Sequence, residues 1–258
     1  MAEAKSAIYI EITATRGSTP RNAGTGMTVT ASQTKGTIGG GALEYQAIAT
    51  ARRILATDGA EQCEAIPLGP NLGQCCGGSV TLLYTYSRNH SAEQPSVDIP
   101  TLKIGTTDPA ELWIWGAGHV GRAVVKTAPP QGFKITWIDT TPDRFPSHIP
   151  PHVTQALAAN MPLLASRAPT SAHHLIFTYS HEIDLALCAV LLKRGAASTG
   201  LIGSQTKWAR FSKRLREMNL DPSPIICPIG DKSLGKHPDQ IAHGTVRTLI
   251  CDSQAKVS

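Results

Sequence analysis

Apolar and polar positions follow two different patterns, and these patterns divide the chain into two parts. In the first part, residues 7–14 alternate as a strand does, residues 28–30 indicate a second strand, and residues 79–86 form a β-branched apolar run. Apolar side chains recur on one helical face over residues 42–57. These elements predict a small α/β domain that spans residues 1–90.

The second part alternates short apolar strands with helices. Strands are predicted at residues 111–115, 133–138, 174–179 and 198–202, and helices after residue 121 and at 183–194 and 207–218. Such alternation predicts a parallel sheet with helices on both faces, a doubly wound domain over residues 110–258. The polar, proline-containing segment 91–109 is predicted to be a linker between the two domains.

A glycine motif opens the first helix of the second domain. Gly116, Gly118 and Gly121 have the spacing G-x-G-x-x-G directly after a predicted strand, and Asp139 follows 18 positions later. This is the context of the dinucleotide-binding Rossmann motif, in which the acidic residue accepts a hydrogen bond from a ribose hydroxyl. The motif predicts a Rossmann-like fold that binds NAD(P). The alternative is a Rossmann-like fold that keeps the glycines for packing and binds another phosphate, or nothing.

Four polar residues of the second domain are further candidates for ligand binding. His119 lies inside the glycine loop, and His181 follows a predicted strand at the edge where open sheets bind ligands. Either histidine is a candidate acid–base group, with a purely structural role as the alternative. Ser204 and Lys207 begin a helix after a strand, which is an arrangement that holds phosphates. The alternative for Lys207 is the basic face of an ordinary amphipathic helix.

The first domain holds an adjacent pair of cysteines, Cys75 and Cys76, between glycines. A thiolate is a soft ligand for a sulfur-rich metal centre, and glycines allow close approach. Because adjacent side chains diverge, we expect one cysteine to contact the metal and the other to pack. The alternative is two small buried apolar residues. Further candidates for binding an anionic cofactor in this domain are Arg16, Arg21 and the turn of Gly39, Gly40 and Gly41. Glu44, one helical turn beyond these glycines, is a further cofactor-binding candidate.

Composition narrows the classes of partner. The net charge of +5 favours anionic ligands but falls short of a DNA-binding protein, and an aromatic content of 5% argues against stacking on single-stranded nucleic acid. No run approaches the roughly 20 apolar residues of a membrane span, and the N-terminus lacks the apolar run of a signal peptide. We therefore expect a cytoplasmic protein with free thiols and without nucleic-acid or membrane partners.

Several blocks of the sequence resemble the XdhC/CoxI family of xanthine dehydrogenase accessory proteins. They occur in the family's order and cover nearly the whole chain. The blocks are residues 14–21, 36–44, 72–78, 115–122, 180–184, 202–207 and 227–230, followed by a Pro-x-x-Ile-Ala helix start at 238–242.

The resemblance implies an accessory factor rather than an enzyme. It implies a chaperone that binds the sulfurated molybdenum cofactor, protects it and inserts it into xanthine dehydrogenase or a related molybdenum hydroxylase. A cysteine desulfurase is the implied sulfur donor, and a homodimer is the implied assembly. Two other hypotheses remain: an NAD(P)-dependent oxidoreductase that uses the glycine motif, Asp139 and His181, and a protein adaptor whose Rossmann-like domain binds no ligand.

Overall fold

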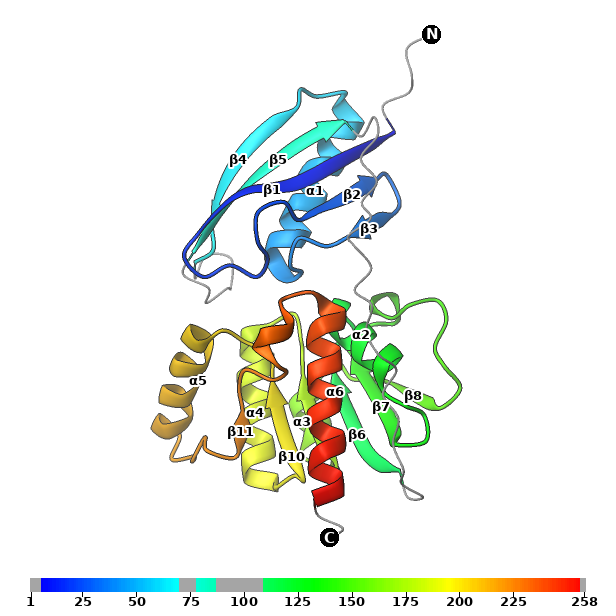
Figure 1. Cartoon of the computed structure of the whole chain (residues 1–258), viewed down its shortest axis with the longest axis vertical. Helices are drawn as coiled ribbons and strands as arrows, with labels where there is room; N and C mark the ends of the chain where they lie inside the picture. Colours follow the sequence, from blue (N-terminus) through cyan, green and yellow to red (C-terminus); the bar gives the residue numbers. More distant parts are fainter. Residues whose placement is uncertain (1–5, 70–77, 87–108, 256–258) are drawn as a thin grey trace. The chain divides into compact units, whose positions relative to one another are not determined.

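The computed structural model describes residues 6–69, 78–86 and 109–255, which fall into two compact units, residues 1–96 and 97–258 (Figure 1). Cys75, Cys76 and nearly all of the predicted linker lie outside the described residues, so the thiol site and the domain limits stay predictions.

The first unit is a five-stranded antiparallel sheet with one helix. The strand order is β3-β2-β1-β5-β4. The strands are β1 (Ala7–Arg16), β2 (Gly26–Thr30), β3 (Thr34–Gly36), β4 (Gln62–Pro67) and β5 (Ser79–Tyr86), and the helix is α1 (Gly41–Thr57). Every second side chain of β1 from Ile8 to Ile12 is fully buried and packs with the buried face of α1. The three predicted strands and the helix are confirmed, whereas the two edge strands β3 and β4 are additional.

The second unit is a six-stranded sheet whose paired strands all run parallel. The order is β8-β7-β6-β9-β10-β11, so the chain starts in the middle, at β6, winds to one edge, and returns to complete the other edge. The strands are β6 (Ala110–Trp115), β7 (Phe133–Asp139), β8 (Val153–Leu157), β9 (His173–Ile176), β10 (Ser198–Leu201) and β11 (Ile225–Ile226). This is the doubly wound order, and it confirms the predicted fold class.

Helices cover both faces of the parallel sheet (Figure 1). They are α2 (His119–Thr127), α3 (Met161–Ala165), α4 (His181–Arg194), α5 (Gln205–Glu217) and α6 (Pro238–Ala255). One apolar core lies under α2 and α6, and a second lies under α3, α4 and α5. Within the described ranges, no helix combines the length and the apolar character needed to cross a membrane.

The topology fixes where a ligand site can form. Winding reverses between β6 and β9, which are neighbours in the sheet. In open α/β sheets the carboxyl ends of two such strands are the position of the ligand-binding crevice. The glycine motif follows β6. The predicted strand 174–179 ends three residues early, at Ile176, and residues 177–180 form the loop on the other side of this crevice.

Candidate functional site

The glycine motif forms a tight turn between β6 and α2. Gly116 has a φ of 116°, and a Cβ on it would lie 2.5 Å from the carbonyl oxygen of Phe177. A Cβ on Gly121 would lie 2.1 Å from the carbonyl oxygen of Gly116. Gly118 differs, because a Cβ there would meet no atom within 4 Å. The first and third glycines therefore serve the close packing of the turn, and the second faces open space at the N-terminus of α2, where a phosphate oxygen fits.

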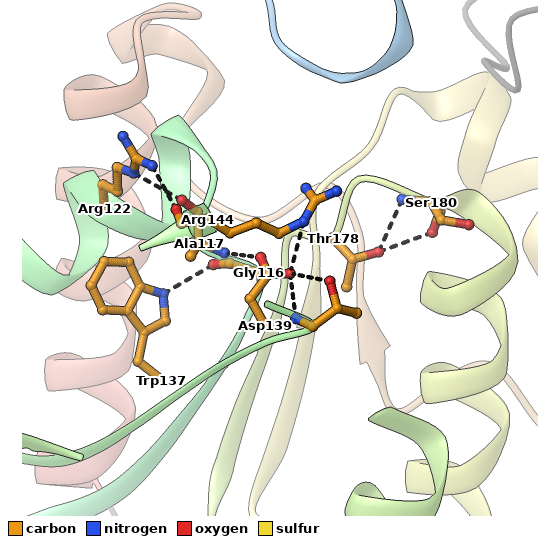
Figure 2. Close-up of polar contacts among 9 residues, drawn as sticks. Gly116, Ala117, Arg122, Trp137, Asp139, Arg144, Thr178 and Ser180 are labelled. Atoms are coloured by element: carbon orange, nitrogen blue, oxygen red, sulfur yellow. Dashed lines mark hydrogen bonds and ion pairs between the residues drawn. The ribbon is translucent and has the colours of Figure 1, made fainter. Parts of the chain in front are cut away.

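Asp139, the last residue of β7, holds this turn in place (Figure 2). Its side chain is only 2% exposed, and its Oδ2 accepts a hydrogen bond of 2.7 Å from the backbone N–H of Ala117. Its Oδ1 accepts one of 2.7 Å from the N–H of Thr140 and lies 3.5 Å from Nε of Arg144. The carboxylate that the sequence assigned to a ribose hydroxyl is thus engaged by the protein's own groups.

Two arginines that sequence analysis did not single out complete the glycine turn. Arg122 donates from Nε to the carbonyl oxygen of Ala117 at 2.9 Å and from Nη2 to that of Arg144 at 2.6 Å. The guanidinium of Arg144 lies over the ring of Tyr179, 3.9 Å from its centroid. No local sequence signal indicates these contacts, because they join segments that follow three different strands.

A buried ion pair lies at the carboxyl ends of β9 and β10. Nζ of Lys207 is 2.6 Å from Oδ2 of Asp184 and donates to the carbonyl oxygen of Ile202 at 3.0 Å. Asp184 is fully buried, and its Oδ1 lies 2.6 Å from the hydroxyl of Thr178. The hydroxyl of Ser204 accepts a hydrogen bond from the N–H of Lys207 and caps α5. The charge of Lys207 is therefore balanced inside the protein rather than presented on a solvated helix face.

The two candidate histidines occupy the first positions of their helices. Burial, aided by the positive charge of Lys207, lowers the pKa of His181 to about 4, so its imidazole is neutral near pH 7. The ring of His181 meets that of Phe211 edge-on, with centroids 6.2 Å apart. His119 begins α2 and is partly buried. A neutral imidazole offers one donor and one acceptor, or a ligand atom for a metal.

In the first unit, Glu44 holds a glycine turn through backbone hydrogen bonds, as Asp139 does in the second unit. It lies in the first turn of α1, is 7% exposed, and its Oε2 accepts hydrogen bonds from the N–H groups of Ile38 (2.9 Å) and Gly40 (3.1 Å). The same oxygen lies 2.5 Å from the hydroxyl of Thr37. Glu44 thereby holds the turn that contains Gly39, Gly40 and Gly41, whose φ angles of 127°, 72° and 65° favour glycine.

The loop 16–21 of the first unit contacts two glycine segments that the sequence singled out. A Cβ on Gly39 would lie 2.7 Å from Cγ of Pro20, and one on Gly78 would lie 2.4 Å from the carbonyl oxygen of Ser18 and 2.5 Å from that of Arg16. The loop 16–21 therefore packs against both glycine segments. Arg21 of this loop is buried, and burial lowers the pKa of its guanidinium, opposed by the negative charge of Glu44.

These features define an α/β protein with a doubly wound parallel-sheet domain and a second domain built on an antiparallel sheet and a glycine turn. The chain belongs to the XdhC family. The model of the XdhC Rossmann domain matches residues 112–246, and that of the XdhC and CoxI family matches residues 1–65.

Two proteins are similar over nearly the whole chain. The uncharacterized protein YqeB of Escherichia coli is 24% identical over 256 residues, which cover 93% of this chain and 42% of YqeB, so the chain spans less than half of that relative. A crystal structure from Bacillus halodurans, described as a xanthine dehydrogenase, is 17% identical with a TM-score of 0.50 and covers 99% of this chain and 94% of its own. This second likeness shows the fold alone.

Proposed function

We propose that this protein is an accessory factor of xanthine dehydrogenase or a related molybdenum hydroxylase, and that it carries the sulfurated molybdenum cofactor as cargo for insertion. Membership of the XdhC family indicates the accessory role. The observation that supports a cofactor carrier is the packing of the loop 16–21 against Gly39 of the glycine turn and against Gly78.

The chemistry of these loops suits the cargo. Molybdopterin is a phosphate-bearing pterin dithiolene, so its carrier needs donors for an anion and a soft contact for sulfur and metal. The buried Arg21 supplies a positive charge beside the glycine turn, where its side chain lies close to Gly39. Cys75 and Cys76, which lie outside the described residues, are the proposed soft contacts, and Cys76 is separated from Gly78 by one residue in the chain.

The proposal includes partners. A cysteine desulfurase would supply the sulfur, the molybdenum hydroxylase would receive the cargo, and a homodimer would be the working form. A carrier must release what it holds, so a site made of surface loops suits this role better than a closed cage of protein ligands would. No catalytic residue is needed for such a function.

Binding of freshly released molybdenum cofactor to the full chain tests this function. We expect molybdenum and pterin fluorescence to co-elute with the protein, and the C75A/C76A variant to lose both while staying folded. Cys63→Ala is the matched control, because Cys63 is an exposed free thiol on β4. Retention of the cofactor by the double variant would refute the thiol contact, and failure of the wild-type protein to retain it would refute the carrier function.

The second candidate is an NAD(P)-dependent oxidoreductase, favoured by the open space at Gly118. Neutral His181 would serve as the acid–base group in this case. Turnover of a small substrate with NAD or NADP, lost on His181→Gln substitution, would support the oxidoreductase over the carrier.

A further inference from the structure

The side chain of Arg144 connects two loops of the second unit that follow different strands. It ends a short 3-10 turn, Pro142–Arg144, that follows β7, whereas Tyr179 follows β9. In the sheet, β6 lies between β7 and β9. The contact between the guanidinium of Arg144 and the ring of Tyr179 therefore passes over the carboxyl end of β6. Figure 2 shows the Arg144 side chain beside the glycine turn that follows β6.

The guanidinium of Arg144 is fixed on two sides. Its Nε faces the carboxylate of Asp139 at 3.5 Å, and one of its faces stacks on Tyr179. Among the residues that the structure describes, no acceptor contacts its two Nη groups, and the side chain is 39% exposed. Such a fork is oriented in advance and free to bind the oxygens of a phosphate in a bidentate manner.

The surroundings of this fork favour an anion. The guanidinium of Arg122 and the open end of α2 at Gly118 lie at the same turn. The negative charge of Asp139 is already balanced by a hydrogen bond from the N–H of Ala117 and by the ion pair with Arg144. The other acid nearby, Asp143, is fully exposed, and its carboxylate is hydrogen-bonded to Thr141.

We propose that Arg144 forms a phosphate subsite in the crevice between β6 and β9, and that it recognises a phosphate monoester on the ribose of a dinucleotide. Rossmann folds that bind NAD use a free carboxylate at the end of the second strand for the ribose hydroxyls, whereas an arginine accommodates the additional phosphate of NADP. Here the carboxylate of Asp139 is bound by groups of the protein, whereas the Nη groups of Arg144 can bind a phosphate. The subsite therefore selects NADP over NAD, and this inference does not depend on the carrier function.

Equilibrium binding of NADP, NAD and inorganic phosphate to the full chain tests the subsite, because the two dinucleotides differ only in one phosphate. One bidentate charged contact corresponds to a preference for NADP of about 10- to 100-fold. We expect Arg144→Gln to remove this preference and Arg144→Lys to keep a part of it. Arg216→Gln, at an exposed arginine of α5, is the matched control and should keep it in full.

Tryptophan fluorescence of each variant establishes that the second unit is folded. Equal affinity for NADP and NAD, or an undiminished preference in the Arg144→Gln variant, would overturn the assignment. Binding of inorganic phosphate without either dinucleotide would also overturn it, because the subsite would then serve a different phosphate ester. None of these results bears on retention of the molybdenum cofactor by the first unit.

Discussion

Replacement of Lys207 by methionine removes a buried cation and leaves the buried carboxylate of Asp184 without its partner. The two groups are 2.6 Å apart, and their side chains are 7% and 1% exposed. Loss of one member of such a pair costs about 3–5 kcal/mol of unfolding free energy. Thr178 still donates to Asp184 through its N–H at 3.2 Å. We therefore expect the lower end, about 3 kcal/mol, which corresponds to a fall in Tm of roughly 6–12 °C.

Urea unfolding followed by tryptophan fluorescence measures this loss in the correct unit. All four tryptophans, at positions 113, 115, 137 and 208, belong to the second unit, so the signal reports on that unit alone. The Lys207→Met, Asp184→Asn and double variants form a cycle. The double variant carries no charge at this buried site, so its loss of unfolding free energy should be smaller than the sum of the two single losses by about 2 kcal/mol.

A loss below about 1 kcal/mol in Lys207→Met, together with additive single effects, would contradict the buried pair. Such a result would favour the prediction from the sequence, in which Lys207 binds a phosphate. The fold would then tolerate the substitution, and only anion binding would fall.

Three further predictions follow from the same contacts. Gly121→Ala should destabilise the second unit by several kcal/mol, whereas Gly118→Ala should leave its urea midpoint nearly unchanged, because only the first Cβ meets backbone. Glu44→Gln should cost the first unit about 1–3 kcal/mol and raise the hydrogen exchange of the glycine turn that it holds. Burial lowers the pKa of His174 and of His181 from 6.5 to about 4, so the unfolded chain binds more protons between these values. The urea concentration at the unfolding midpoint of the second unit should therefore decrease as the pH is lowered from about 6.5 to about 4. A midpoint that does not change over this pH range would contradict the prediction.

Local patterns were sufficient to predict the elements that depend on neighbours in sequence. The glycine turn 116–121 and the helix α1 follow from spacing alone, since a turn or an amphipathic face is specified within a few residues. The edge strands β4 and β8 expose most of their side chains, so they show little apolar alternation that a sequence pattern could detect. The helix α3 has only five residues, too few for a helical period to be evident.

The candidate site was less predictable, because its contacts join distant segments. Asp139 was identified from its distance to the glycines, but its partner, the N–H of Ala117, depends on how the turn folds back onto β7. Lys207 was identified as a cation, but Asp184 lies 23 positions away and was not recognised as its counter-ion. Neither Arg144 nor Tyr179 belongs to a motif, so only the strand order brings them together.

The glycine turns of the two units are stabilised in the same way. In each, a buried carboxylate accepts hydrogen bonds from backbone N–H groups of the turn: Glu44 from Ile38 and Gly40, and Asp139 from Ala117. Since these acids are paired with the N–H groups of the turns, the charged groups beside the turns that can attract a ligand are arginine side chains. Such groups select anions, which agrees with the net charge of +5. Substitution of either acid should therefore affect ligand binding through the shape of the turn, whereas substitution of an arginine should affect it directly.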